Sequence, residues 1–414
     1  MTPSMRALST APTGKRLRLR VTREAERHLR AGHPWLYDQA ITKQDRDGSP
    51  GDLAVIYDHA NKFLAVGLYD PASPIRVRVL QRQAPAPIDA AWFQARLREA
   101  IADRAALAAS ATTGYRLVHG ENDGLPGLVV DRYADTLVLK LYTAAWSPYL
   151  GLVQEALRAV QPKAKRLILR LSRMLSDRRA PAGGLKDGAV LAGPPMREPV
   201  VFEEHGLRFE VDPIRGQKTG FFLDQRENRA KTERYCRRAS VLDLFAYTGA
   251  FSVYAARGGA REVLSVDLSR PALAATRRNV ARNASHRAVA AARHQVLQGD
   301  AYAALDTLRR RALQFDVVIV DPPSFAQTAA QTRPALAAYG RLARLGLAVL
   351  RPSGVLVASS CSSHVPATDF FAAMHRAARA ERRHLLELER TGHPVDHPVR
   401  FPEGAYLKCL FARA

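Results

Sequence analysis

Cysteine, acidic residues and long apolar runs are all scarce in this chain of 414 residues. The three cysteines are Cys236, Cys361 and Cys409, and such a low, odd count argues against a disulfide framework and is typical of a reducing cytosol. No apolar run reaches the roughly 18 residues of a transmembrane helix. The basic stretch at 1–20 lacks the apolar core of a secretory signal. We therefore expect a cytoplasmic protein that has no membrane partner.

The scarcity of acidic residues leaves a large positive charge. Asp and Glu number 39 against 62 Lys and Arg, which gives a formal net charge of +23. This excess favours a polyanionic partner, because basic groups that neutralise phosphates release condensed counterions. An arginine-rich proteome is the alternative explanation. Hydrophobic residues make up 47% of the chain, so cores can form, and only residues 1–13 are expected to be a disordered tail or a basic arm that touches RNA.

Short strands separated by turn residues dominate the first part of the chain. The predicted strands are residues 17–21, 51–57, 63–67 and 75–80. A short helix is expected at 24–31, ending at Gly32. Strands at this spacing predict a compact β-barrel over residues 14–84.

A proline- and alanine-rich linker at 83–88 precedes a region that mixes both kinds of element. Helices are expected at 89–111 and near 148–160, strands at 128–131, 136–140 and 166–170, and a loop at 176–193. This mixture predicts an α+β middle domain over residues 89–212.

Strands then alternate regularly with helical stretches over residues 213–414. The predicted strands are residues 240–245, 262–267, 293–298, 315–320 and 354–359. This alternation predicts a doubly wound, mostly parallel sheet with helices on both faces, the Rossmann-like form of an α/β domain.

Successive predicted strands of this domain end in polar or small residues. After the first strand comes a small-residue turn in which Gly249 lets a ligand approach the backbone. Asp267 ends the second strand, where a carboxylate can accept hydrogen bonds from ribose hydroxyls. Asp300 follows the third strand and suits the exocyclic amine of adenine, and Asp321 opens an Asp-Pro-Pro turn after the fourth. Ligands of open parallel sheets bind at these carboxyl ends.

Each of these aspartates, taken alone, could simply cap a helix. Their occurrence in consecutive order, together with Asp243 in the first strand and the Asp-Pro-Pro turn, favours S-adenosylmethionine as the cofactor. The first turn is not a GxGxxG phosphate grip, which disfavours a dinucleotide.

Motifs spread over nearly the whole chain resemble one family. They stand at 32–35 (Gly-His-Pro-Trp), 117–127, 203–206, 216–226, 396–398 (Asp-His-Pro) and 402–408. In this order they are similar to the bacterial class I methyltransferases that act on the C5 of a cytosine in 23S ribosomal RNA, the large-subunit m5C1962 type. The resemblance implies an N-terminal PUA-like domain and a cofactor site covered by the segment at 216–226. The expected cofactor-binding residues are Gln217, Phe222, Asp224, Asp243, Phe245, Thr248, Gly249, Asp267, Leu268, Asp300, Ala301 and Asp321; no metal site is expected.

The chemistry of this reaction needs a thiolate, because C5 of a pyrimidine is a poor nucleophile until a thiolate adds at C6. Cys361, just past the fifth predicted strand, is the predicted nucleophile, and Asp321 is predicted to hydrogen-bond N3 of the ring. A structural role in a packed core is the alternative for Cys361. Cys236, whose basic neighbours could lower its pKa, and Cys409 are expected to be structural. Ser324 stands where many RNA m5C enzymes carry a second cysteine, so the base that removes the C5 proton is left unassigned.

RNA would be held by the first domain, where basic residues and two aromatic side chains are concentrated. These residues are Lys15, Arg16, Arg18, Arg20, Arg23, Arg27, Arg30, Arg76 and Arg78, with Trp35 and Tyr37. Phe325 could stack on the target base or belong to the core. The alternatives are methylation of guanine N7 or N2, a non-catalytic assembly factor that retains the cofactor fold, and a small-molecule methyltransferase. The form of the RNA, naked or in an assembly intermediate, and the choice between monomer and homodimer stay open.

Overall fold

The computed structural model describes residues 16–176 and 184–414, so the expected N-terminal tail lies outside the described residues. The chain forms two compact units. The first comprises the chain up to Val200 together with Val211–Phe221 and Val395–Phe401. The second comprises Val201–Glu210, Phe222–Pro394 and Pro402–Ala414. No helix of the described residues is long and apolar enough to cross a bilayer.

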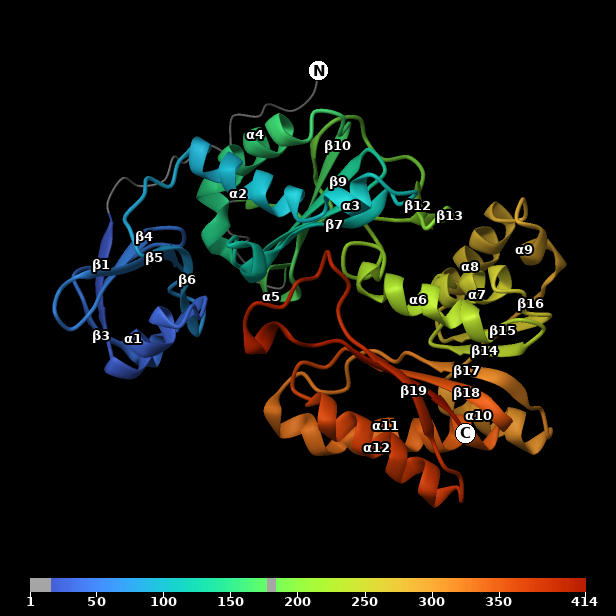
Figure 1. The fold of residues 1–414 in the computed structure, drawn as a ribbon. Helices are drawn as coiled ribbons and strands as arrows, with labels where there is room; N and C mark the ends of the chain where they lie inside the picture. Colours follow the sequence, from blue (N-terminus) through green and yellow to red (C-terminus); the bar gives the residue numbers. More distant parts are fainter. Residues whose placement is uncertain (1–15, 177–183) are drawn as a thin grey trace. The chain divides into compact units, whose positions relative to one another are not determined.

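A six-stranded sheet opens the first unit (Figure 1), with the strand order β2-β6-β5-β4-β1-β3. Its elements are β1 (Leu17–Val21), α1 (Arg23–Arg30), β2 (Trp35–Tyr37), β3 (Ile41–Gln44), β4 (Leu53–Tyr57), β5 (Phe63–Tyr69) and β6 (Ile75–Arg82). Along β1 the leucines and Val21 are buried and the two arginines are exposed, as the period of two predicts. Thr22 caps α1, because its hydroxyl oxygen accepts a hydrogen bond from the Ala25 amide at 3.2 Å.

A five-stranded sheet with the order β11-β10-β9-β8-β7 forms the rest of this unit. Its elements are α2 (Ala90–Ala102), α3 (Ala105–Ala108), β7 (Gly114–His119), β8 (Leu128–Tyr133), β9 (Thr136–Leu141), α4 (Leu150–Val160), β10 (Arg166–Leu171), α5 (Arg173–Ser176) and β11 (Val190–Ala192). The helix predicted at 89–111 is shorter, because α2 ends at Ala102 and α3 is a separate turn. The loop predicted at 176–193 was wrong at β11, which pairs antiparallel with β10; residues 177–183 lie outside the described part.

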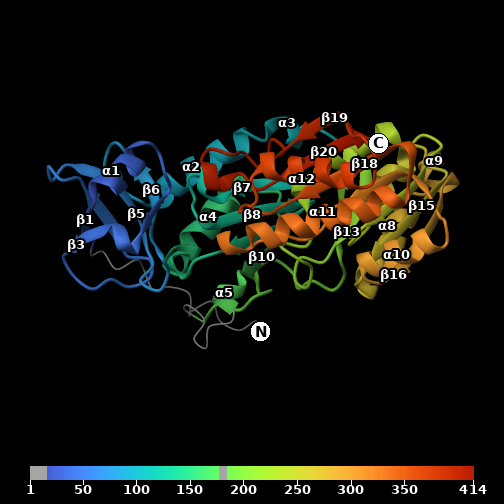
Figure 2. The same ribbon diagram turned by 90° about the horizontal axis from the view of Figure 1, so that it is seen from below.

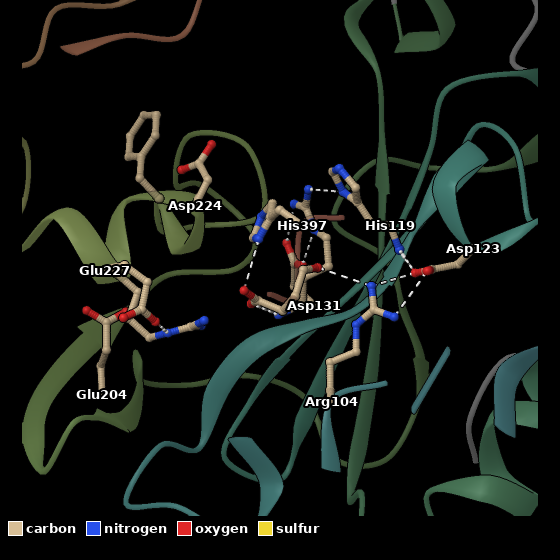
Figure 3. A network of polar contacts seen from close by, with 12 residues as sticks. Arg104, His119, Asp123, Asp131, Glu204, Asp224, Glu227 and His397 are labelled. Carbon is tan, nitrogen blue, oxygen red and sulfur yellow. Dashed lines mark hydrogen bonds and ion pairs between the residues drawn. The ribbon is translucent and has the colours of Figure 1, made fainter. Parts of the chain in front are cut away.

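Buried charges tie distant segments of the chain to this sheet. Arg104, fully buried, forms two hydrogen bonds to the Asp123 carboxylate, at 3.1 and 2.7 Å, and Figure 3 shows the two side chains directed at each other. Arg104 also donates to the Asp396 carbonyl oxygen at 3.2 Å. The Asp396 carboxylate accepts the backbone amide of Arg116 at 2.9 Å.

The same sheet also holds the segment at 212–221. Asp131 of β8 is fully buried, pairs with Arg116 at 2.7 Å and accepts the Thr219 hydroxyl at 2.5 Å. Tyr133 contacts the same hydroxyl at 3.0 Å. The motifs at 117–127, 216–226 and 396–398, which are far apart in sequence, therefore meet in one polar network. Paired buried charges of this kind allow few substitutions at either position, because removing one partner leaves the other charge buried and unpaired.

The second unit is built on a seven-stranded sheet with the order β16-β15-β14-β17-β18-β20-β19. Its strands are β14 (Ser240–Leu244), β15 (Glu262–Asp267), β16 (Arg293–Gln298), β17 (Phe315–Val320), β18 (Leu350–Ser360), β19 (Leu386–Thr391) and β20 (Lys408–Arg413). The first five strands pair in parallel, and β20 runs antiparallel to β18 and β19. All five parallel strands predicted from the sequence are confirmed.

Helices cover both faces of this sheet, as predicted. They are α6 (Arg226–Thr232), α7 (Ala250–Arg257), α8 (Arg270–Arg282), α9 (Arg287–Ala291), α10 (Ala301–Arg310), α11 (Thr332–Ala348) and α12 (Ala367–Ala380). Leu242 and Leu244 point into the core shared with α10, α11 and α12, whereas Val241 points into the core shared with α7 and α9. Helices α11 and α12 lie side by side (Figures 1 and 2).

A small hairpin, β12 (Val200–Glu204) and β13 (Leu207–Val211), contributes a buried ion pair to this unit. Arg229 of α6 donates to both carboxylate oxygens of Glu204 at 2.8 and 2.7 Å, and Tyr254 of α7 donates to the same carboxylate at 3.0 Å. Arg229 and Glu204 are both at least 98% buried. This pair therefore fixes α6, which leads into the site, against the hairpin.

Candidate active site

The carboxyl ends of four adjacent parallel strands lie at one edge of the second sheet. The register pairs Leu244 with Val266 on one side and with Val320 on the other, so the strands end almost level. Asp267 and Asp321 are the residues at or just after two of these ends, and Asp300 follows β16. The structure thus brings the carboxylates to the edge at which open α/β sheets bind ligands.

The turn after β14 is conformationally strained. Phe245 and Tyr247 have positive φ angles of 60° and 50°, and Gly249 has 75°. A Cβ on Gly249 would lie 2.2 Å from Cγ2 of Thr276, so no larger residue fits without a shift. Asp267 anchors this turn to β15 by accepting the Tyr247 amide at 2.8 Å. Strain held in place this way is typical of a backbone shaped around a ligand.

Polar atoms without partners lie buried beside this turn. Asp243 is 1% exposed, and one of its carboxylate oxygens accepts the Ser252 hydroxyl at 2.6 Å. Its other oxygen, and the hydroxyl of Thr248, have no hydrogen-bond partner in the described part of the chain. Burial raises the pKa of Asp243 to about 7, and the nearby Asp321 and Asp267 act in the same direction. A polar ligand such as S-adenosylmethionine fits here, because it would satisfy atoms that are costly to leave unpaired.

Asp300 and its neighbours give a mixed result. The Asp300 carboxylate accepts the amides of Tyr302 and Ala303 at 3.0 and 3.2 Å, so it caps α10, the ordinary role that the sequence left open. Ala301 is the first residue of that helix. Leu268, next to Asp267, is 72% exposed, an unusual place for a leucine that leaves its side chain available to an apolar ligand surface.

The segment predicted to cover the cofactor is divided between the two units. Phe222 packs edge-on against Tyr247 of the strained turn, with ring centroids 5.3 Å apart. Asp224 accepts the Tyr406 hydroxyl at 2.9 Å. Gln217 is exposed and belongs to the first unit, so its contact with a cofactor stays a prediction.

The predicted nucleophile and its partner follow neighbouring strands. Asp321 comes directly after β17 and Cys361 directly after β18, and the register pairs Val320 with Ala358. Cys361 is partly exposed, whereas Cys236 and Cys409 have 0% exposure.

The basic neighbours of Cys236 do not lower its pKa, because burial raises that pKa well above the usual range. Burial likewise raises the pKa of Cys409 to about 12, consistent with the structural role expected for both thiols.

A chain of hydrogen bonds that the sequence analysis missed ends on Asp321. Thr391 donates to the Asn228 amide oxygen at 2.5 Å, and Asn228 donates to the Gln225 amide oxygen at 2.5 Å. Gln225 then donates to Oδ1 of Asp321 at 2.7 Å. Because an amide nitrogen can only donate, the chain favours the ionised carboxylate of Asp321. The Asp-Gln-Arg-Glu-Asn run at 224–228 was the available signal, but nothing in it points to a partner 96 residues away.

Several polar side chains surround the loop that carries Cys361. Tyr339 of α11 contacts the hydroxyls of Ser360 and Ser362, each at 3.0 Å, and the Ser362 hydroxyl contacts that of Ser324 at 2.8 Å. Phe325 packs against Tyr339, with ring centroids 4.8 Å apart, which places it in the core rather than above an open site. No group of three or more metal-ligating side chains is present in the described residues.

The basic face of the first domain is smaller than predicted. Arg78 is 7% exposed and bonds the Ile75 carbonyl oxygen, so it was wrongly assigned to the RNA-facing surface. Arg30 is paired with Asp58 at 2.7 Å. The exposed arginines of the predicted set are Arg16, Arg18, Arg20, Arg23, Arg27 and Arg30, and Lys15 lies outside the described residues.

Of the two predicted stacking residues, Trp35 donates to Glu121 at 2.9 Å and Tyr37 is 42% exposed.

The second unit is a class I S-adenosylmethionine-dependent methyltransferase domain, as its strand order, its antiparallel β20 and the carboxylates at the carboxyl ends of its strands indicate. A PUA-like domain precedes it in the chain. The family model for an S-adenosylmethionine-dependent methyltransferase matches residues 174–413, and that for a PUA-like domain matches residues 19–82. A solved S-adenosylmethionine-dependent methyltransferase from Streptococcus mutans is 25% identical, with a TM-score of 0.81 over 96% of this chain and 100% of its own. Another solved methyltransferase, complexed with S-adenosylhomocysteine, has a TM-score of 0.82 at 24% identity, covering 96% of this chain and 100% of its own.

Curated relatives are similar over nearly their full length. The ribosomal RNA large subunit methyltransferase of Deinococcus radiodurans is 48% identical over 97% of this chain and 98% of its own. The ribosomal RNA large subunit methyltransferase I of Pseudoalteromonas translucida is 35% identical over 94% and 97%. The chain belongs to this family of S-adenosylmethionine-dependent ribosomal RNA large subunit methyltransferases.

Proposed function

We propose that this protein transfers a methyl group from S-adenosylmethionine to C5 of a cytosine in 23S ribosomal RNA. One observation carries the cytosine-C5 assignment: of three cysteines, the partly exposed one follows the strand next to Asp321, at the ligand-binding edge of the sheet. The names of the relatives support a large-subunit RNA substrate.

The same proposal includes a cytoplasmic location. It also divides the chain into three domains, at residues 14–84, 89–212 and 213–414.

The cofactor is proposed to lie across the strained turn. Asp267 would bind its ribose hydroxyls, and Leu268 would pack against its adenine. The unsatisfied oxygen of Asp243 and the Thr248 hydroxyl would take its polar groups. The remaining predicted contacts are Gln217, Phe222, Asp224, Phe245, Gly249, Asp300, Ala301 and Asp321. Bound S-adenosylmethionine supplies an electrophilic methyl group whose bonding electrons return to the sulfonium sulfur on transfer.

Cys361 is proposed to activate the base. Its thiolate adds to C6, which moves the ring's double-bond electrons so that C5 can form the new carbon–carbon bond to the methyl group. As electron density moves onto the ring, N3 takes up a proton from water, and the Asp321 carboxylate accepts a hydrogen bond from that N3–H; the proton is released again when the double bond re-forms. A base then removes the C5 proton, the electrons reform the double bond, and the Cys361 thiolate leaves. Asp321 acting through a water is the proposed base, since Ser324 carries no thiol.

Transfer of tritiated methyl groups to unmodified 23S RNA tests the proposal, with the position of the product mapped by mass spectrometry. Cys361→Ala should abolish incorporation, and the matched control Cys236→Ala should retain it. RNA that contains 5-fluorocytosine should trap a covalent complex with the wild-type protein, because fluorine replaces the proton that must leave.

Three results would count against the assignment. Full activity of Cys361→Ala would favour methylation of guanine N7 or N2. The absence of any incorporation by the wild-type protein would favour an assembly factor. Incorporation into a small molecule alone would remove the RNA substrate.

A further inference from the structure

Lys408 of β20 is a buried lysine whose partners are uncharged. It is 4% exposed, and its ammonium group donates to the carbonyl oxygens of Ser362 and Tyr406, the latter at 3.0 Å. In the described part of the chain, no carboxylate forms an ion pair with it. Burial of an ammonium group without a counter-charge is expensive, so an anion is to be expected close by.

The position of Lys408 points to one candidate anion. The register of β18 and β20 pairs Lys408 with Ser360, and its ammonium group bonds the carbonyl oxygen of Ser362. Lys408 therefore contacts the chain on both sides of Cys361. Burial lowers the pKa of Lys408 to about 8, and a negative charge on Cys361 acts in the opposite direction. Lys408 thus remains mostly protonated near neutral pH, as a counter-charge must.

Two titratable groups near Cys361, Asp321 and Tyr339, do not offer a positive charge. Asp321, at the end of β17, carries a negative charge that opposes a thiolate. Tyr339, on α11, is uncharged, because burial raises its pKa. Without a compensating cation, Cys361 would hold its proton more tightly than an ordinary thiol, since a nearby negative charge disfavours ionisation.

We propose that Lys408 is a positioning residue that provides the counter-charge for the thiolate of Cys361. Its two carbonyl contacts hold the ammonium group in place before the thiol ionises, so ionisation releases only a proton to solvent and needs no rearrangement. The catalytic role of this counter-charge rests on the proposed function, in which Cys361 is the nucleophile. The charge coupling itself can be measured without RNA or cofactor.

Alkylation of the full-length protein by iodoacetamide, followed by mass spectrometry, measures the coupling from about pH 5 to pH 10. Cys236 and Cys409 have 0% exposure, so the native-state rate reports Cys361, and Cys361→Ser provides the background. The wild-type profile should have its midpoint below about 8.5, the ordinary value for a thiol. In Lys408→Gln the midpoint should rise by about one pH unit or more, and the rate at pH 7 should fall roughly tenfold.

The matched control is Lys231→Gln, because Lys231 lies in the same unit but already pairs with Glu389. Its profile should equal that of the wild type. An unchanged midpoint in a folded Lys408→Gln protein would overturn the inference. If that variant does not fold, the wild-type profile decides, since a midpoint at or above about 8.5 rules out the counter-charge. The two proposals can fail separately. If Cys361→Ala loses methyl transfer but Lys408→Gln keeps the wild-type alkylation profile, only the role of Lys408 is refuted.

Discussion

Replacing Gln225 with leucine should slow methyl transfer without abolishing cofactor binding. Gln225 donates to Asp321 at 2.7 Å and is itself fixed by Asn228, so the substitution removes the last bond of a directed chain. A hydrogen bond to a charged group contributes about 1.5–3 kcal/mol, which corresponds to roughly a 10- to 150-fold fall in kcat if the bond acts in the transition state. Thr391→Val, which removes a neutral bond at the far end, should lower kcat by less than about tenfold.

Two measurements separate positioning of Asp321 from a general loss of structure. The ionised form of Asp321 loses a donor in Gln225→Leu, so the acidic limb of the pH–rate profile should move to higher pH. The double variant with Thr391→Val should lose less than the sum of the single effects, because both changes break one chain. Gln295→Leu, at an exposed glutamine of the same sheet, is the control. A folded Gln225→Leu enzyme with wild-type kcat and an unmoved acidic limb would refute the reasoning.

Three further perturbations test the fold around the site. Gly249→Ala should weaken S-adenosylmethionine binding at least tenfold by calorimetry, because its Cβ would meet Thr276 at 2.2 Å; wild-type affinity would show that the turn is not a ligand cradle. Arg229→Met should lower the free energy of unfolding in urea by about 3–5 kcal/mol, since Glu204 would remain buried and unpaired, and adding Glu204→Leu should restore part of the loss. Burial lowers the pKa of His294 to about 4 from 6.5, so the unfolded state binds the proton first. The free energy of unfolding should therefore decline by up to about 3 kcal/mol as the pH falls from about 6.5 to 4. The His294→Gln protein should lack this decline, and an equal decline in that variant would contradict the assignment to His294.

The parallel strands were predictable because each combines a continuous apolar run with a polar or small residue at its end. Residues 315–320, for example, read as a buried strand and form β17. Strands at the sheet edges were missed for the opposite reason. In β3 no residue is fully buried, and in β19 two leucines alternate with glutamates but Leu386 is exposed, so neither strand has a fully buried apolar face. Their pairing comes from neighbouring strands rather than from local sequence.

The same distinction applies to the site. Asp267 and Asp321 could be identified because each follows a recognisable strand. Gln225 and Lys408 could not, because their importance depends on partners that the antiparallel return of β20 and the position of α6 bring close. For Asp300 the position alone does not distinguish two roles, since a carboxylate that follows a strand also stands where a helix cap is needed; its contact with the cofactor stays a prediction.

The segment at 395–401 affects how this protein can be made. It belongs to the first unit, although most of that unit lies before residue 201 in the chain. Arg104 of this unit donates to the carbonyl oxygen of a residue that lies 292 positions further along the chain. On the ribosome the N-terminal half must therefore remain incomplete until translation is nearly finished. An N-terminal fragment that ends before Val395 would leave the buried Arg104 guanidinium without the Asp396 carbonyl oxygen and the Arg116 backbone amide without the Asp396 carboxylate, so we expect such a fragment to be less stable than the complete unit.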